Sequence, residues 1–282
     1  MTAPFDFDFE RRLPGPPLAA WCEALWFARG TIPYTRERIA PTGSTVAVLV
    51  LGDPITETAD DGDGPAVTTD RGFLVGPHTR PVINEPTGET YAVGIVGTPV
   101  GCEALFGVAP RTLKGRVLLL EEVWPAAAAL REQLLAAADK HGMLDVLESF
   151  LVAHLGPAPA GAARCARAVT LLEADPTRPI ADIADELGIS HPHLDREFTR
   201  VVGITPRALA RLLRMRRLLA QLDVRGDVGW AALAADLGWF DQAHLIRDFK
   251  RHTGVTPSQY IAAQRAQFSP VDAGDAAGFV PE

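Results

Sequence analysis

Residues 180–206 read IADIADELGISHPHLDREFTRVVGITP, and residues 230–257 read WAALAADLGWFDQAHLIRDFKRHTGVTP. The two stretches hold the same residue types in register, with one extra residue in the middle of the second. The matched pairs are Ala184/Ala234, Leu187/Leu237, Gly188/Gly238, His193/His244, Leu194/Leu245, Arg196/Arg247, Phe198/Phe249, Gly203/Gly254, Thr205/Thr256 and Pro206/Pro257. A repeat of this kind indicates one supersecondary unit that is used twice.

Each copy predicts a helix, a tight turn and a second helix. Apolar residues at helical spacing run from residue 180 and stop at Gly188, because glycine enters the left-handed cap conformation without a steric penalty. A second helix follows, with Leu194 and Phe198 facing inward, and it ends at Gly203. This is a helix-turn-helix, whose second helix is shaped to lie in the major groove of DNA.

The two copies are joined by a segment that predicts one continuous helix. Thr205 and Pro206 form a start signal, with a threonine cap and a proline at the first helical position. From residue 206 to 222 the chain has no helix breaker, and its leucines provide an apolar face. A basic face is predicted from Arg207, Arg211 and Arg214. Such a helix is about 25 Å long, which suits two units near the roughly 34 Å spacing of successive major grooves.

Residues 162–265 resemble the DNA-binding domain of AraC/XylS-type transcriptional regulators. The resemblance rests on both turns, the linker and both Gly-x-Thr-Pro endings, which occur in order at residues 203–206 and 254–257. It implies a domain of seven helices that places two recognition helices in consecutive major grooves of an asymmetric site.

Helix geometry also predicts which side chains face DNA. Because Leu194 and Phe198 face the core in the first copy, and Leu245 and Phe249 in the second, the residues on the opposite sides of these helices point outward. The predicted DNA-binding residues are His191, Pro192, Asp195, Arg196, Thr199, Arg200, Gln242, Ala243, Ile246, Arg247, Lys250 and Arg251. Arginine can pair with guanine and glutamine with adenine, whereas a carboxylate accepts only from cytosine. An ordinary solvated helix face is the alternative for these positions.

The charge distribution agrees with this interpretation. The whole chain has a formal net charge of −8, which by itself disfavours a nucleic-acid partner. Residues 162–268, however, carry 15 Lys and Arg against 12 Asp and Glu, a net charge of +3, whereas residues 1–161 carry a net charge of −8. The positive part of the chain therefore coincides with the repeat.

The first half predicts a β-rich domain followed by helices, so the fold class is α+β. Strands are predicted over Trp21–Gly30, as a pair within Arg36–Leu51, and over Phe73–Gly76 and Thr90–Val96. An irregular lead-in is predicted over residues 1–20, and an acidic surface loop over Asp53–Asp70. Helices are predicted over Val100–Phe106, Ala126–His141 and Met143–Leu155. The predicted domains are residues 1–156, a Pro/Ala/Gly linker at 157–161, the DNA-binding domain at 162–268 and a disordered acidic tail at 269–282.

The first half also resembles the amino-terminal domain that is fused to AraC-type DNA-binding domains in actinobacterial regulators. The resemblance rests on Trp26-Phe27, Glu37–Gly43, Val75–Pro81 and the join of strand to helix at Gly94–Gly107. That pattern usually has an aspartate where this chain has Thr42, and an arginine at a strand end where it has Gly97-Thr98.

An enzyme, or a repair protein with a catalytic site in the first half, is the alternative class. The sequence carries no nucleophile elbow, zinc-protease motif, phosphate loop or dinucleotide fingerprint, so a non-enzyme is predicted. Three separated cysteines (Cys22, Cys102 and Cys165) fit buried thiols, and His191 and His193 lie at a spacing that does not converge on a metal, so neither cofactor nor metal is expected. His78, beside Arg80, fits a loop cap better than the wall of a ligand pocket.

The expected partner is double-stranded DNA. RNA polymerase, a small-molecule effector of unknown identity and a second copy of the chain remain open, and an effector site is not predicted. No membrane segment and no signal peptide are recognised, so a cytoplasmic protein is expected.

Overall fold

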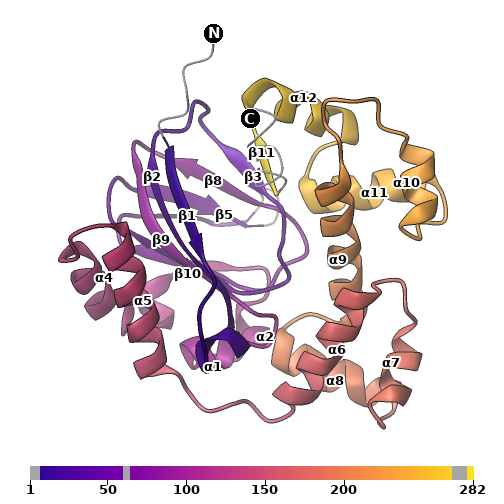
Figure 1. The fold of residues 1–282 in the computed structure, drawn as a ribbon, viewed down its shortest axis with the longest axis horizontal. Helices are drawn as coiled ribbons and strands as arrows, with labels where there is room; N and C mark the ends of the chain where they lie inside the picture. The colour runs from indigo at the N-terminus through magenta and orange to yellow at the C-terminus, as the bar shows by residue number, and fades with distance from the viewer. Residues whose placement is uncertain (1–6, 60–63, 269–277) are drawn as a thin grey trace.

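The computed structural model describes residues 7–59, 64–268 and 278–282, and it has an α+β fold (Figure 1). The first half contains most of two antiparallel sheets and the second half is mainly helical, so the predicted fold class is confirmed. Within the described residues, no helix is long and apolar enough to cross a membrane.

The first sheet has six described strands in the order β1-β2-β9-β4-β7-β10. Their bounds are β1 Phe7–Arg12, β2 Cys22–Gly30, β9 Thr90–Gly97, β4 Val46–Val50, β7 Gly72–Val75 and β10 Val117–Leu119. The second sheet has five described strands in the order β11-β3-β8-β5-β6. These are β11 Phe279–Pro281, β3 Glu37–Ile39, β8 Val82–Pro86, β5 Ile55–Thr58 and β6 Ala66–Thr69.

Strand β4 shows why the first sheet is buried on both faces. Successive side chains of a strand point to opposite faces. Val48 and Val50 therefore pack in the apolar layer between the two sheets, whereas Ala47 and Leu49 pack against helices. The first two of these helices lie between β9 and β10, and the other three follow β10. They are α1 Cys102–Phe106, α2 Pro110–Leu113, α3 Leu120–Val123, α4 Ala127–Leu135 and α5 Lys140–His154, and the short helix η1 Leu18–Ala20 precedes β2.

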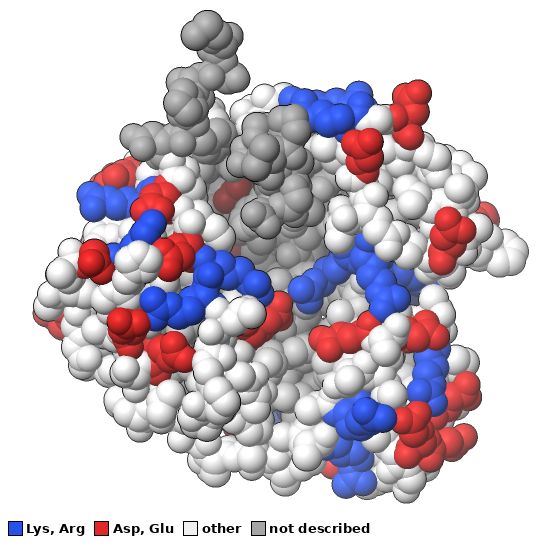
Figure 2. All heavy atoms as spheres, viewed as in Figure 1, with Lys and Arg blue, Asp and Glu red and all other residues white. Residues whose placement is uncertain are grey.

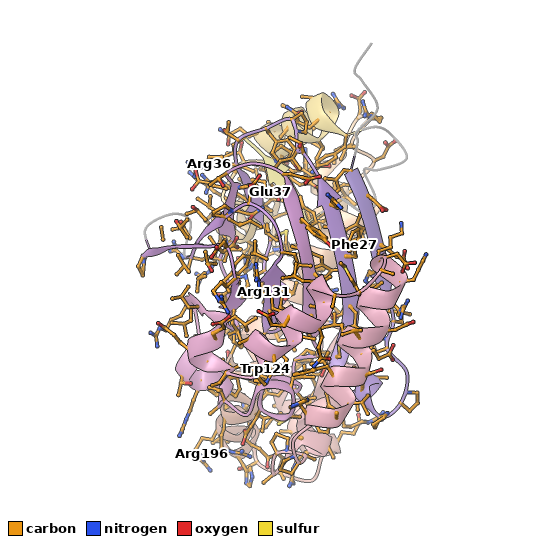
Figure 3. The ribbon with its side chains drawn as sticks, turned by 90° about the vertical axis from the view of Figure 1, so that its left-hand side faces the viewer. Phe27, Arg36, Glu37, Trp124, Arg131 and Arg196 are labelled. Carbon is orange, nitrogen blue, oxygen red and sulfur yellow. The ribbon has the colours of Figure 1, made fainter. Side chains whose placement is uncertain are left out.

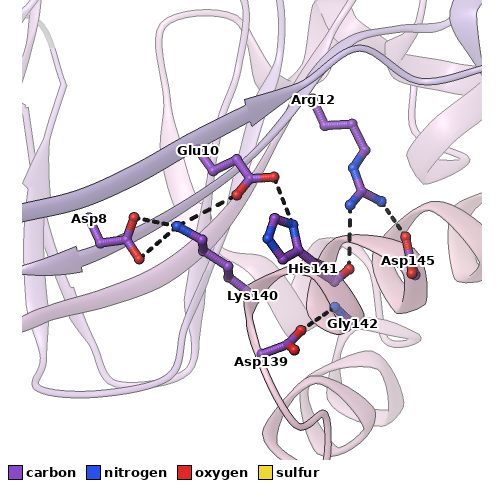
Figure 4. Close-up of polar contacts among 8 residues, drawn as sticks. All are labelled: Asp8, Glu10, Arg12, Asp139, Lys140, His141, Gly142 and Asp145. Atoms are coloured by element: carbon purple, nitrogen blue, oxygen red, sulfur yellow. Dashed lines mark hydrogen bonds and ion pairs between the residues drawn. The ribbon is translucent and has the colours of Figure 1, made fainter.

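Ion pairs fix α5 beside β1 at the edge of the first sheet (Figure 4). The pairs are Asp8–Lys140, Glu10–Lys140, Glu10–His141 and Arg12–Asp145. The Nζ of Lys140 lies 2.7 Å from Oδ1 of Asp8, and Nδ1 of His141 lies 3.2 Å from Oε1 of Glu10. Solvent screens ion pairs near the surface, so these pairs orient the helix more than they stabilise it.

Several predictions for the first half were wrong. Residues 7–12 form β1 although an irregular lead-in was expected, and the predicted loop over Asp53–Asp70 contains the paired strands β5 and β6. Their β-branched residues favour strands, and this preference outweighs the flanking glycines and aspartates. The predicted pair within Arg36–Leu51 consists of two strands that lie in different sheets, because β3 pairs with β8 and β4 pairs with β7 and β9.

The helix predicted over Ala126–His141 is interrupted, because α4 ends at Leu135 and α5 begins at Lys140. The carboxylate of Asp139 accepts a hydrogen bond from the backbone N–H of Gly142, and this cap starts the new helix. The predicted disordered tail is wrong for its last residues, since β11 pairs with β3, while residues 269–277 lie outside the described residues.

Two buried carboxyl groups point into the layer between the sheets. Glu57 shares a strand face with Ile55, which packs in that layer, and both Glu57 and Glu37 lie opposite Asn84 in the strand register. Glu37 accepts hydrogen bonds from the side chains of Asn84 and Tyr34, both at 2.9 Å. Burial raises the pKa of both carboxyls, and that of Glu57 is raised well above its usual range. Glu37 lies near the upper end of the molecule, far from Arg196 at the lower end (Figure 3).

The raised pKa of Glu57 makes stability depend on pH. The folded state retains the proton that the unfolded chain releases above a pH of about 4.3, so stability falls as the pH rises toward the folded-state pKa. Glu57→Gln removes this dependence, and it should raise the melting temperature at pH 8 by about 3 °C or more, with a much smaller gain at pH 5. Thermal melts of both proteins check this, with Glu122→Gln on the surface as the matched control. An equal gain at both pH values would contradict it.

Candidate nucleic-acid interface

The first predicted helix-turn-helix is present. Helix α7 spans Ile180–Glu186 and helix α8 spans His191–Val202. Gly188 in the turn has a φ of +68°, and Gly203 at the end of α8 has a φ of +89°, so both adopt the left-handed conformation that favours glycine. Leu194 and Phe198 are fully buried, as the pattern predicts. The opposite side of α8 is therefore left to face outward.

The second unit repeats this construction. Helix α10 spans Trp230–Asp236 and helix α11 spans Gln242–Thr253. Asp241 caps α11 by accepting a hydrogen bond of 2.6 Å from the backbone N–H of His244. Leu245 and Phe249 are fully buried, and the Phe249 ring meets those of Trp230 and Tyr260 edge to face.

Helix α9, Pro206–Gln221, joins the two units and belongs to the cores of both. Its start is capped by Thr205, whose hydroxyl accepts from the backbone N–H of Ala208. Leu209 and Leu212 pack in the core of the first unit, whereas Leu218 and Leu219 pack in that of the second. Sixteen residues span about 24 Å, so α9 holds the units at a fixed separation. With α6 Ala162–Ala174 and α12 Pro257–Gln267, the described residues from 162 to 268 form seven helices.

The predicted DNA-binding residues gather on one side of α8 and one side of α11. His191, Pro192 and Arg196 are exposed on α8, while Asp195, Thr199 and Arg200 are half-buried. On α11, Ile246 is half-buried and the exposed members are Gln242, Ala243, Arg247, Lys250 and Arg251. Basic side chains lie over α9 and near the helices below it, interspersed with acidic ones (Figure 2).

Three of these side chains already have partners within the protein. Nε2 of His191 lies 3.5 Å from Oδ2 of Asp195, one helical turn away. The guanidinium of Arg200 donates a hydrogen bond to the carbonyl of Ala160 in the segment before α6. His191, Asp195 and Arg200 thus have structural contacts in addition to the predicted role.

Arg214, which was predicted for the basic face of α9, contacts the second unit. Its Nη1 donates to the carbonyl of Gly238 at 2.8 Å, its guanidinium lies 4.6 Å from the centre of the Trp239 ring, and Nη2 lies 3.6 Å from Oδ2 of Asp248. Burial lowers the pKa of Arg214, while the carboxylate of Asp248 opposes that effect. Arg214 therefore links α9 to the second unit, whereas Arg207 is exposed and Arg211 is half-buried.

The structure adds one residue that the pattern did not single out. Phe240 is 93% exposed and directly precedes the Asp241 cap of α11. An aromatic ring at the start of a recognition helix can make apolar contact with a thymine methyl group. The only sequence signal was an aromatic residue in a turn, outside the helical period of the apolar residues.

Loops of the first domain touch both units. The Nδ1 of His252, near the end of α11, lies 2.8 Å from the carbonyl oxygen of Thr79, and burial lowers the pKa of this histidine. A Cβ placed on Gly203, at the end of α8, would lie 2.9 Å from Cγ of Pro77. A Cβ on Gly43 would lie 2.8 Å from a methyl carbon of Leu209 in α9. The first domain thus contacts α8, α9 and α11.

His78 lies within the same loop as Pro77 and Thr79, and its side chain is buried. Its Nδ1 lies 2.8 Å from the carbonyl oxygen of Gly76, and burial lowers its pKa. This contact within the loop agrees with the predicted loop cap. The cysteines of the first half are also buried, which raises the pKa of Cys22 to about 12 and that of Cys102 to about 11.

Comparisons with known proteins agree with this geometry. Residues 183–263 match the family model of a helix-turn-helix domain, and residues 10–118 match that of a domain of unknown function, DUF6597. No curated protein matches the chain.

Among solved structures, ToxT from Vibrio cholerae is similar at 14% identity, with a TM-score of 0.47, over 91% of this chain and 98% of ToxT. A ToxT structure with bound unsaturated fatty acid is similar at 13% identity and the same TM-score, over 91% of this chain and 94% of that one. An AraC-type regulator from Chromobacterium violaceum is similar at 28% identity, with a TM-score of 0.34, over 39% of this chain and all of that one.

The matched domain covers both helix-turn-helix units and the helix between them. The predicted family and the predicted class of function are thereby confirmed. Residues 183–263 are an AraC-type helix-turn-helix domain, and the chain is a DNA-binding transcriptional regulator.

Proposed function

We propose that this regulator reads one site in double-stranded DNA with α8 and α11 in successive major grooves. The supporting observation is that both helices expose their polar side while α9 packs in the cores of both units. Two recognition helices that are separated by one turn of the DNA double helix, together with flanking contacts, cover a site of about 17–20 base pairs. Arg196, Arg247 and Gln242 are proposed to read bases, and Arg200, Lys250 and Arg251 to hold phosphates.

The first domain, residues 1–156, is proposed to modulate DNA binding by residues 162–268, with a linker at 157–161. Its support is that Pro77 and Thr79 lie against the ends of both recognition helices. A change in the conformation of the loop that contains Pro77 and Thr79 would alter how α8 and α11 bind DNA together. A small-molecule effector, RNA polymerase and a second copy of the chain are the candidate sources of such a change.

The regulator is further proposed to act in the cytoplasm and without catalysis. An enzyme in the first half would need an activated nucleophile or a poised acid and base. Burial raises the pKa of Cys22 and Cys102, which keeps these thiols protonated, and a protonated thiol is a poor nucleophile.

Replacing Arg247 by alanine tests the proposed reading of bases. Arg247→Ala should weaken binding to a genomic site selected by the wild-type protein by about 1–3 kcal/mol, because a bidentate contact to guanine is lost. Binding to random DNA should change little. Titration of labelled duplexes in a gel-shift assay measures both affinities.

Two further variants separate base reading from electrostatics. Lys250→Ala should weaken binding to both duplexes alike if Lys250 holds a phosphate. Arg29→Ala, which removes an exposed arginine paired with Glu89 in the first domain, should leave both unchanged. An unaltered affinity of Arg247→Ala for the selected site would remove Arg247 from the reading set.

A further inference from the structure

The first domain carries a basic segment on its surface. Arg111, Lys114 and Arg116 are all exposed, and no acidic residue occurs between Glu103 and Glu121. This is unusual in a half of the chain whose net charge is −8. Among the described residues, neither Arg111 nor Lys114 forms an ion pair. The two cations are therefore available to an external anion.

The segment lies against the first recognition helix. Helix α2, which begins it, packs on α8, and a Cβ on Gly203 would lie 3.1 Å from the carbonyl oxygen of Pro110. Arg111 lines one shallow depression together with Asp195, Arg196, Thr199 and Arg200. Arg111 thus faces the same hollow as four residues of the predicted reading surface.

The charges around this depression favour an anion. Three arginines line the depression with only one carboxylate, that of Asp195, so its lining carries an excess of positive charge. When a recognition helix enters a major groove, the phosphates of the groove edge lie beside it and accept hydrogen bonds from neighbouring arginines and lysines. With α8 in a major groove, the anion beside this depression would be a DNA phosphate.

We propose that the segment Pro110–Arg116 of the first domain is part of the DNA-binding surface. Arg111 and Lys114 hold phosphates at the edge of the groove that α8 reads. The inference rests on the proposed reading of DNA by α8 and α11, and it adds that the first domain contributes affinity directly. The opposite role, in which α2 shields α8 from DNA, is an outcome of the test.

The test uses the full chain and the variant Arg111→Ala/Lys114→Ala. Each lost phosphate contact lowers the slope of log affinity against log salt by about 0.9, so the double variant should reduce it by about 2. Its affinity at low salt should fall about tenfold or more, equally for the selected site and for random DNA. Fluorescence anisotropy titrations between about 50 and 200 mM salt measure both quantities.

Controls make the outcome decisive. Both replaced side chains are exposed, so thermal melts should match the wild type, and Arg29→Ala removes a cation elsewhere in the same domain without effect. If the double variant binds as tightly as the wild type with an unchanged slope, the segment does not touch DNA. Tighter binding would assign it the shielding role. In either case a loss of specific binding in Arg247→Ala would leave the proposed function intact.

Discussion

Replacing Asp248 by alanine should destabilise the second helix-turn-helix unit by about 3–5 kcal/mol and abolish binding to the selected DNA site. The carboxylate accepts a hydrogen bond of 3.1 Å from the indole N–H of Trp239 and lies 3.6 Å from the guanidinium of Arg214. Without it, the half-buried cation of Arg214 loses its counter-charge and the buried indole N–H of Trp239 loses its acceptor. Denaturant titration followed by tryptophan fluorescence measures the loss.

Two matched variants define what Asp248 contributes. Asp248→Asn keeps an acceptor for Trp239 but removes the charge that faces Arg214, so its cost should be intermediate. Asp236→Ala replaces an exposed aspartate on α10, and such surface changes stay within about 0.5 kcal/mol. If Asp248→Ala costs no more than Asp236→Ala, the contact with Arg214 is unimportant for stability.

Phe198→Ala should cost about 3–5 kcal/mol, because it leaves a cavity in the core of the first unit. Phe198 is fully buried on the inner side of α8. Phe240→Ala is the matched control, since it deletes the same side chain from a position that is 93% exposed. It should leave the melting temperature unchanged and can lower only the affinity for DNA. Thermal melts and gel shifts of both variants separate the two effects, and equal stability losses would contradict the assignment of the core.

The sequence predicts the second domain far better than the first. The repeat places equivalent core positions such as Phe198 and Phe249 in register, so the prediction of one helix-turn-helix unit supports that of the other. The helical spacing of the apolar residues then determines which side of each helix faces outward. Strands β5 and β6 had no such support. Their alternation extends over four residues each, between glycines and aspartates that indicate a loop.

Contacts between distant segments are what the sequence does not reveal. Helical spacing places Arg214 beside Arg207 and Arg211, yet Trp239 and Asp248 draw its side chain toward the second unit. The contact of α2 with α8 is of the same kind, because nothing in residues 110–116 indicates which helix they meet. Periodicity describes one element at a time, whereas these contacts depend on how elements pack.

Strand β11 has a consequence for any motion of the second unit. The chain leaves α12 at Gln267 and returns at Phe279–Pro281 to pair with β3, where the side chain of Gln264 also meets the carbonyl of Phe279. The second unit is thus tethered to the first domain at its far end as well as through α9. If α11 moves relative to the sheets, β11 must separate from β3. Deletion of the last few residues of the chain would remove that restraint.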